Sequence, residues 1–349
     1  MDKILTVSIA AYNVEKTIEE CLDSFLPSRY FDDLEILVIN DGSNDNTANI
    51  VSKYEKKYPD TIHLINKVNG GHGSTLNKSL ELATGKFYKA VDGDDWVDTK
   101  ELDKLCDCLK NTNADLVVDN NYKEVYPDHT RLISLKTKYI FEKIYQFDEL
   151  FQLGNNYEDN LFVLQISTVR TQCLRDVDMK IQEHCFYVDT ELYFYIGLSV
   201  QKVLFLDSCT YRYRLSNSGQ SVSAEGYYNH IEDLIKVEKN LLHLYSLYEH
   251  RIKSRVRREY LFSIVDTRYS MLFGCYTKII QRADKDYLFV DFLQYAKEEY
   301  PLLLKKMHLS LINRYIEANP VRRIQLIRCI RKTLIFKILR KIKNLLKLK

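Results

Sequence analysis

The sequence lacks any long apolar run. No stretch reaches the roughly 18 apolar residues that a membrane-spanning helix needs, which argues against an integral membrane protein. The start, Met1-Asp2-Lys3, leads directly into a strand-like run without a small-residue cleavage pattern, so we expect no secretory signal. The eight cysteines are scattered, and only Cys106 and Cys108 lie close together. This spacing argues against a disulfide scaffold or a zinc module and predicts reduced, mostly buried thiols in a cytosolic protein.

Two phosphate-binding motifs are also missing. There is no G-x-x-x-x-G-K-[ST] segment and no G-x-G-x-x-G segment after the first strand-like run. A different glycine-rich segment, Asn69–Thr75, precedes a helical pattern. Such a loop can present backbone N–H groups to an anion, and it can equally be a structural turn.

Acidic residues are absent from the last thirty positions. The segment Pro320–Lys349 carries eleven basic residues, whereas the other 319 residues carry 39 basic and 48 acidic residues, a net charge of −9. The whole-chain charge of +2 therefore describes neither part. The 46% hydrophobic and 28% charged residues are typical of a globular protein, and 349 residues correspond to about two domains.

Strand and helix patterns alternate over the first 110 residues. This alternation predicts a mostly parallel sheet covered by helices. The predicted strands are 4–11, 34–39, 62–65 and 86–91, and the predicted helices are 15–26, 45–58 and 75–83. Residues 111–225 are mixed, with strands expected at 116–118 and 203–206 and a helix at 190–198, and residues 227–299 have a helical period.

Polar residues follow three of the predicted strands. They are Tyr12-Asn13 after Ala10-Ala11, Asn40-Asp41-Gly42-Ser43, and Asp92-Gly93-Asp94-Asp95. Ligands of open parallel sheets bind outside the carboxyl ends of the strands, so we expect these residues to line one site.

The acidic cluster Asp92, Asp94, Asp95 and Asp98 suits a divalent cation. Oxygen ligands of this kind bind Mg²⁺ or Mn²⁺, often together with substrate phosphates. The alternative is a solvated acidic loop or a helix cap, since Asp98 and Thr99 can open a helix. An EF-hand is excluded as a good match because Val97 occupies the position that needs glycine.

These segments, in this order and spacing, resemble family 2 glycosyltransferases of the GT-A fold. The resemblance is carried by Tyr12-Asn13, by VINDGSNDNT (Val38–Thr47), by the glycine-rich segment and by ATGKFYKAVDGDDW (Ala83–Trp96). It covers about residues 4–110. A weaker match, to the acceptor half of bacterial surface-polysaccharide members, joins Tyr187–Leu192 with TYRYRLSNSGQSVS (Thr210–Ser223).

The resemblance implies a role for each matching position. Tyr12 should pack on the nucleotide base and Asp41 should hydrogen-bond it, while Asp92 should lie against the ribose or the metal. Asp94, with Asp95 as its substitute, should coordinate Mn²⁺ or Mg²⁺, and Asp189 matches the catalytic base. Asp189 can alternatively cap the helix that begins at Thr190, and His184 and Glu191 are then the other candidate bases. The remaining implied donor-binding residues are Ala10, Asn13, Gly71, His72, Gly93 and Arg214.

The sequence departs from the family pattern at three points. Val188 stands before Asp189 where many members have Glu, and Asn40 stands before Asp41 where many have Asp. Leu76 replaces an arginine of the third helix, which leaves one diphosphate contact unfilled. His72, Lys78 or Arg214 can fill it, and the sequence does not choose among them.

The implied protein is an inverting, metal-dependent hexosyltransferase. It would move a sugar from a nucleotide donor, expected to be UDP-linked, to a glycan or lipid-linked acceptor in surface polysaccharide synthesis. The implied divisions are a nucleotide-sugar-binding half at 1–110, an acceptor and catalytic half at 111–225, a helical extension at 226–319 and a basic tail at 320–349. The alternatives are a sugar nucleotidyltransferase and a non-catalytic carbohydrate-binding or scaffold protein.

The basic tail has an apolar face. Isoleucine and leucine recur at spacings of three or four from Ile327 to Leu345, among lysines and arginines. Such a helix suits an anionic membrane surface, which predicts a cytoplasmic protein peripheral to the inner face of the cell membrane. The alternatives are a helix packed on the body and a nucleic-acid-binding segment. The acidic body argues against the latter, so no nucleic-acid partner is expected.

Overall fold

A computed structural model describes residues 3–135, 139–152, 161–215, 223–279, 282, 284–307, 324 and 326–327. The chain divides into two compact units. The first comprises Met1–Ser218 and Ile252–Leu261, and the second comprises Gly219–Arg251 and Phe262–Lys349. The four divisions expected from the sequence stay a prediction.

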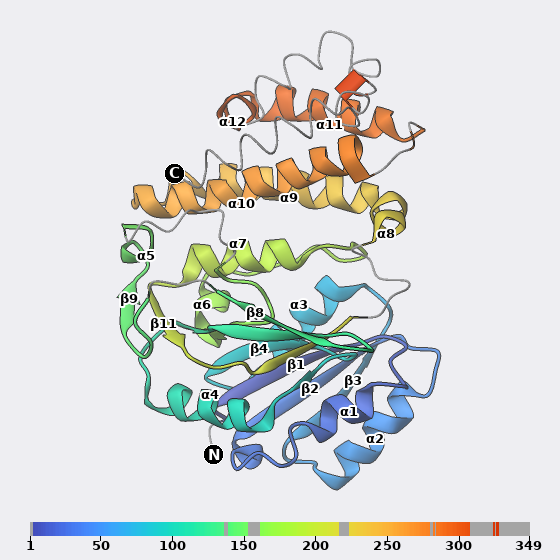
Figure 1. Cartoon of the computed structure of the whole chain (residues 1–349), viewed down its shortest axis with the longest axis vertical. Coiled ribbons are helices and arrows are strands. Elements are labelled where there is room, and N and C mark those ends of the chain that lie inside the picture. The colour runs from blue at the N-terminus through green and yellow to red at the C-terminus, as the bar shows by residue number, and fades with distance from the viewer. Residues whose placement is uncertain are drawn as a thin grey trace. The chain divides into compact units, whose positions relative to one another are not determined.

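The first unit is built on an eight-stranded sheet in the order β3-β2-β1-β4-β10-β6-β11-β9 (Figure 1). Strands β3, β2, β1 and β4 are parallel, as the alternating sequence pattern predicted. β10 then runs antiparallel to both β4 and β6, which makes the sheet mixed beyond that point. The strands are β1 (Leu5–Ala11), β2 (Leu34–Asp41), β3 (Ile62–Lys67), β4 (Phe87–Asp92), β6 (Leu116–Asp119), β9 (Ile144–Gln146), β10 (Ser167–Arg170) and β11 (Lys202–Leu206).

Helices cover both faces of this sheet. In Figure 1, α1, α2 and α4 lie on one face and α3, α6 and α7 on the other. Every residue of β2 and every residue of β1 except Ala10 is buried, and most of them are apolar, as expected for strands covered on both sides. The helices are α1 (Ile18–Asp23), α2 (Thr47–Lys57), α3 (His72–Leu82), α4 (Thr99–Asn111), α5 (Glu149–Gln152), α6 (Thr171–Asp176) and α7 (Asp189–Ser199), with a 3₁₀ turn at Phe31–Asp33.

Helix α3 begins earlier than predicted. The sequence pattern placed its start at Thr75, but the helix starts at His72. Gly71, directly before it, has φ 78°, a left-handed conformation that glycine adopts without strain. The apolar period alone did not reveal this start because residues 72–74 carry no apolar side chain of helical spacing.

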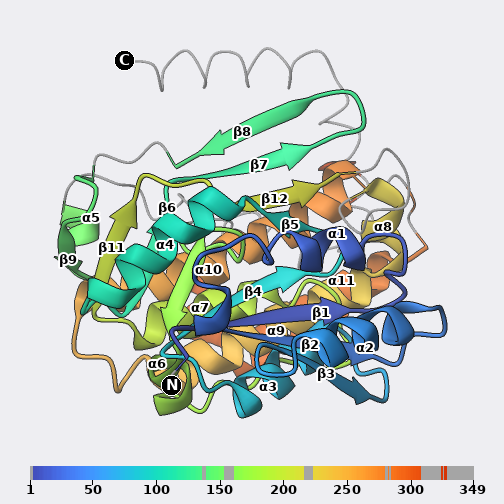
Figure 2. The same cartoon turned by 90° about the horizontal axis from the view of Figure 1, so that it is seen from below.

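A second, four-stranded sheet was not predicted. Its order is β5-β12-β7-β8, formed by β5 (Trp96–Val97), β12 (Tyr211–Arg214), β7 (Asn121–Val125) and β8 (Thr130–Ser134) (Figure 2). β12 runs antiparallel to β5 and parallel to β7. This pairing places Tyr211–Arg214 beside the acidic turn that ends β4.

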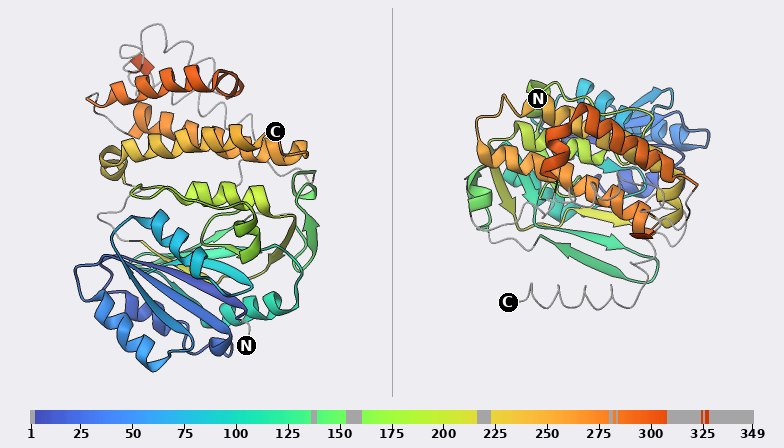
Figure 3. Two further views of the ribbon diagram at one scale, coloured as in Figure 1. Left: turned by 180° about the vertical axis from the view of Figure 1, so that it is seen from behind. Right: turned by 90° about the horizontal axis from the view of Figure 1, so that it is seen from above.

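The second unit is helical. It contains α8 (Ala224–Asn229), α9 (Ile231–Tyr248), the later part of α10 (Arg255–Gly274), a π-helical turn (Cys275–Ile279), α11 (Asp286–Glu299) and α12 (Pro301–Lys306) (Figure 3). The helical period expected over 227–299 is therefore confirmed. In the described part of the chain, no helix has the length and apolar character needed to cross a membrane. The predicted tail helix lies outside the described residues, apart from 324, 326 and 327.

Candidate active site

Three strand ends meet at one edge of the large sheet, as the sequence predicted. β2, β1 and β4 are neighbours, and Ala10 of β1 lies opposite Asp92 of β4 while Ala11 lies opposite Asn40 of β2. The backbone N–H of Gly93 donates to the Ala10 carbonyl oxygen at 2.9 Å. A Cβ on Gly93 would lie 2.8 Å from that oxygen, so this close approach requires glycine.

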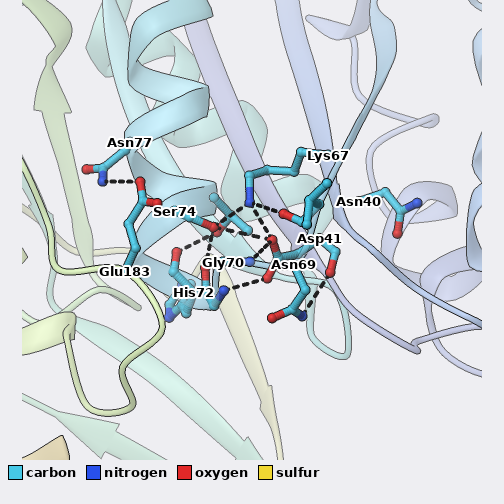
Figure 4. Close-up of polar contacts among 12 residues, drawn as sticks. Asn40, Asp41, Lys67, Asn69, Gly70, His72, Ser74, Asn77 and Glu183 are labelled. Atoms are coloured by element: carbon cyan, nitrogen blue, oxygen red, sulfur yellow. Dashed lines mark hydrogen bonds and ion pairs between the residues drawn. The ribbon is translucent and has the colours of Figure 1, made fainter.

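Asp41, at the end of β2, holds the glycine-rich loop. Its side chain is buried and accepts hydrogen bonds from the backbone N–H groups of Gly70 (2.9 Å) and Gly71 (2.8 Å). Lys67 Nζ lies 2.6 Å from the same carboxylate, and Ser74 Oγ lies 3.3 Å from it (Figure 4). The described contacts therefore give Asp41 a loop-holding role, and its bond to a nucleotide base stays a prediction.

The residues after β1 are tied to the loop after β2. Asn13 adopts φ 52°, and its Oδ1 accepts from the backbone N–H of Asn44 at 2.9 Å. The Asn13 N–H donates to Ser43 Oγ at 3.0 Å. The neighbouring Tyr12 side chain is half exposed, so a flat ring is available at this edge of the sheet.

The acidic turn after β4 contains three carboxylates in different surroundings. Asp92 is half-buried, Asp94 is exposed and Asp95 is buried. Surrounding protein and the charge of Asp92 raise the pKa of Asp94 to about 6. Burial and the charges of Asp92 and Asp94 raise the pKa of Asp95 well above its usual range. The three groups therefore repel one another, which a bound cation would relieve.

Asp95 has partners on both of its oxygens. Tyr211 Oη donates to one at 2.6 Å, and the backbone N–H of Arg214 donates to the other at 2.7 Å. Because Asp95 is also buried, its carboxylate is not open to a ligand in the way that Asp94 is. Its predicted place in the metal shell stays untested, and the geometry leaves Asp92 and Asp94 as the more accessible pair. Asp98 caps α4 and pairs with Arg212.

Arg214 lies against the acidic turn but is already engaged. Its Nε donates to the Asp94 carbonyl oxygen at 2.7 Å, and its Nη2 lies 2.6 Å from Glu20. The guanidinium also lies 4.5 Å from the centre of the Trp96 ring. Arg214 thus fixes the outer side of the turn.

Of the residues that can fill the unfilled diphosphate contact, His72 lies beside the acidic turn. Its Nε2 is 3.5 Å from Asp92 Oδ1 and is a buried atom without a hydrogen-bond partner among the described residues. Lys78 instead pairs with Glu81, and Leu76 is buried in the core. Of the three candidates, His72 is the one with an unused polar atom at the acidic turn.

Asp189 is the first residue of α7 and is half-buried. No side-chain capping bond is formed at the start of this helix, and Asp189 instead accepts a hydrogen bond from Tyr193 Oη at 2.9 Å. Burial and then the charges of Asp95, Asp92, Asp94 and Asp189 raise the pKa of Tyr213. The half-buried Tyr213 phenol is thus close enough to all four carboxylates for their charges to act on it, and the place of Asp189 in the same site stays a prediction.

The two other candidate bases have different surroundings. Glu191 is buried and accepts hydrogen bonds from the backbone and the side chain of Gln182. It therefore holds the preceding loop in place. His184 is exposed, with φ 51°, and its backbone N–H donates to the Gly70 carbonyl oxygen at 2.5 Å. Geometry thus favours Asp189 among the three.

The loop before α7 is fastened to α3. Asn77 exchanges two hydrogen bonds with the backbone of Ile181, at 2.8 and 2.9 Å, and also donates to Glu183 (Figure 4). A Cβ on Gly73 would lie 1.9 Å from the Gln182 carbonyl oxygen. Helix α3 and the loop thus form one packed support that joins the glycine-rich segment to the start of α7.

Sequence reasoning missed Tyr211 and Tyr213 as site residues. Both belong to the quoted segment Thr210–Ser223, but only the unpredicted pairing of β12 with β5 brings them to the acidic turn. Among the described residues, no group of three or more histidine, cysteine, aspartate or glutamate side chains is arranged to hold a metal ion. A separate cavity of about 710 Å³, lined by Lys104, Cys108, Glu142 and others, contains none of the predicted site residues.

The N-terminal part of the chain is similar to glycosyltransferases. Residues 6–166 match the family described as Glycosyl transferase family 2. The chain is 34% identical over 124 residues to the uncharacterized glycosyltransferase EpsJ of Bacillus subtilis, covering 36% of each chain. It is 26% identical over 228 residues to the glycosyltransferase GlyA of Streptococcus pneumoniae, covering 63% of this chain and 32% of GlyA. The matches thus span about a third of the length of these relatives.

Two further similarities are to a glucosyltransferase and to a solved structure. A poly(ribitol-phosphate) beta-glucosyltransferase of Bacillus spizizenii is 31% identical over 116 residues, which are 33% of this chain and 18% of that enzyme. The crystal structure of S. aureus TarS 1-349 in complex with UDP-GlcNAc aligns with a TM-score of 0.64 at 20% identity. The alignment covers 93% of this chain and 90% of the TarS chain, and it shows that the two share the GT-A fold.

Proposed function

We propose that the chain is an inverting hexosyltransferase, because residues 6–166 match family 2 glycosyltransferases and the chain has the GT-A fold. It takes a sugar from a nucleotide donor, a UDP-sugar, and transfers it to a hydroxyl of a glycan or lipid-linked acceptor in surface polysaccharide synthesis. The observation that carries this proposal is the meeting of the ends of β1, β2 and β4 at one edge of the sheet, where β12 binds the acidic turn Asp92–Asp95.

The donor nucleotide binds across the ends of β1 and β2. The half-exposed Tyr12 ring offers a stacking surface for the base. The loop held by Asp41 keeps the backbone of Gly70 and Gly71 at the start of α3. His72 donates to the diphosphate through the buried nitrogen that has no described hydrogen-bond partner.

Asp94 and Asp92 would hold a divalent cation, Mn²⁺ or Mg²⁺. Their carboxylate oxygens are the hard donors that these ions prefer, and one or two carboxylates with substrate phosphates make a usual shell. Burial and the charge of Asp92 raise the pKa of Asp94, and this fits a site completed by positive charge. When bound, such an ion supplies Lewis acidity that stabilises the leaving diphosphate.

Asp189 takes the proton of the acceptor hydroxyl. A sugar hydroxyl is a weak nucleophile near neutral pH, so a carboxylate must accept its proton as the bond to the anomeric carbon forms. Tyr193 orients Asp189 through a 2.9 Å hydrogen bond. One displacement from the face opposite the diphosphate inverts the anomeric centre, and it needs one base rather than the two carboxylates of a glycosidase.

The basic tail places the enzyme at the membrane. We assign residues 320–349 to the inner surface of the cell membrane, because eleven basic residues and a helical apolar face suit anionic lipid. An enzyme held there meets a lipid-linked acceptor by diffusion in two dimensions. Binding of the full chain and of a chain ending at 319 to anionic and neutral vesicles tests this assignment. Equal binding of the two chains would remove it.

Calorimetry with UDP tests the donor site. The full chain is titrated with UDP with and without Mn²⁺, and so are Asp94→Ala and the control Asp128→Ala, which removes an exposed carboxylate from the β7–β8 turn. We expect Mn²⁺-dependent binding in the wild type and in Asp128→Ala, and its loss in Asp94→Ala. A screen of UDP-sugars for transfer then identifies the donor.

The other outcomes separate the alternatives. UDP binding that is equal with and without Mn²⁺ would remove the metal role of Asp94. Absence of UDP binding, followed by absence of binding to other nucleotides, would favour a non-catalytic carbohydrate-binding protein. Release of pyrophosphate from a nucleoside triphosphate and a sugar phosphate would instead indicate a nucleotidyltransferase.

A further inference from the structure

We infer that Tyr211 is a positioning residue for the acidic turn, acting through Asp95. Its hydroxyl fixes the two ends of the turn Asp92–Asp95, so that Asp94 is held at the position where the donor diphosphate and its cation bind. The inference rests on the proposed function and deepens it, because it assigns the metal-dependent part of donor binding to a residue of β12.

The hydroxyl of Tyr211 contacts both ends of the turn. It donates to Asp95 Oδ2 at 2.6 Å, accepts from the backbone N–H of Asp92 at 3.2 Å and lies 3.5 Å from Asp92 Oδ2. The turn is also closed by a hydrogen bond from the Asp95 N–H to the Asp92 carbonyl oxygen at 3.0 Å. One phenol oxygen thus bridges two carboxylate residues that flank Asp94.

The ring of Tyr211 is itself fixed. Its side chain is fully buried, and the Nζ atom of Lys89 lies 6.0 Å from the ring centre. Lys89 is also buried, donates to the Gln165 carbonyl oxygen at 3.0 Å and lies 3.6 Å from Asp119. Asp119 in turn accepts from Thr210, the residue before Tyr211, at 3.2 Å. These contacts restrict the movement of the Tyr211 ring.

Asp95 connects the acidic turn to β12. Both of its oxygens accept hydrogen bonds from β12, one from Tyr211 Oη and one from the Arg214 N–H. Removing the hydroxyl leaves one oxygen of a buried carboxylate without this donor, which is strongly unfavourable unless the group moves. A shift of Asp95 moves Asp94, its neighbour in the turn.

The test compares two matched tyrosine substitutions. Tyr211→Phe removes the bridging hydroxyl. Tyr88→Phe removes the hydroxyl of another fully buried tyrosine, which lies on β4 as Asp92 does and is hydrogen-bonded to Ser79 at 2.6 Å. UDP binding to the full chain is measured by calorimetry with and without Mn²⁺. Binding of Mn²⁺ alone is followed by the fluorescence of Trp96, the single tryptophan of the chain, which adjoins Asp95.

We expect Tyr211→Phe to weaken Mn²⁺-dependent UDP binding about tenfold, the effect of one buried hydrogen bond. Binding without Mn²⁺ should not change, and Tyr88→Phe should bind as the wild type does. In an Asp95→Asn background, Tyr211→Phe should add little, because both changes act on one contact. This double-mutant comparison also detects a general loss of stability in Tyr211→Phe, because such a loss would weaken binding by the same factor in the wild type and in Asp95→Asn.

Two results overturn the inference. One is wild-type Mn²⁺-dependent UDP affinity in Tyr211→Phe, and the other is an equal loss in Tyr88→Phe. In either case the wild type still binds Mn²⁺ and UDP, so the proposed function survives. A wild type that shows no Mn²⁺-dependent UDP binding would refute the proposed function, and the role of Tyr211 would fall with it.

Discussion

Gly73→Ala tests whether α3 and the loop before Asp189 form one packed support. A Cβ at position 73 would lie 1.9 Å from the Gln182 carbonyl oxygen and 2.8 Å from Ile181 Cγ2. Both neighbours are held in place, because Asn77 binds the Ile181 backbone and Glu191 binds Gln182. The added methyl group therefore has to displace backbone by about an ångström rather than a flexible side-chain end.

The magnitude follows from two opposing effects. Overpacking of this kind lowers the free energy of unfolding by about 1–3 kcal/mol. Replacing glycine by alanine inside a helix raises it by about 0.5–1 kcal/mol. We therefore expect Gly73→Ala to lower the free energy of unfolding by about 1 kcal/mol, and by about 2.5 kcal/mol at most. We also expect weaker transfer activity, because the displaced loop leads directly to Asp189.

Chemical denaturation followed by circular dichroism measures the change. The matched control is Gly274→Ala, at the end of α10, where no atom of the described residues lies within 4 Å of the added Cβ. This control should be as stable as the wild type or more stable by up to about 1 kcal/mol. A Gly73→Ala protein that unfolds at the same denaturant concentration as Gly274→Ala would refute the packing argument.

Asp189→Asn should lower sugar transfer at least about a hundredfold while UDP affinity stays unchanged, because it removes a base and no donor contact. Transfer that persists in this variant would move the base to another residue. Glu238, in α9, is fully buried, and neither of its carboxylate oxygens has a hydrogen-bond partner in the described parts of the chain. Burial raises its pKa well above the usual value, so the folded protein holds a proton that the unfolded chain releases as the pH rises. The free energy of unfolding should therefore fall by up to about 1.4 kcal/mol from pH 5 to pH 6 through this group, and Glu238→Gln should lose that dependence. Thermal unfolding at the two pH values measures it, and an identical pH slope in both proteins would contradict the assignment.

The sequence by itself determined the parallel half of the large sheet and the polar edge where its strands end. Apolar runs and helical periods are local signals, and the carboxyl ends of adjacent parallel strands meet by geometry, so Tyr12, Asp41 and Asp92 were placed correctly at one edge. The resemblance then pointed to Asp189, which the structure places at the start of α7, and its role as the base stays a prediction.

Only the tertiary structure decided how these side chains are used. Asp41 is bound by backbone N–H groups of the glycine-rich loop, about thirty residues away, and Asp95 is bound by β12, more than a hundred residues away. The second sheet that brings Tyr211 to Asp95 is made of strands two to five residues long, whose own patterns are too short to predict. Long-range strand pairing therefore separated the open carboxylate of Asp94 from the buried one of Asp95, which the run of aspartates in the sequence did not distinguish.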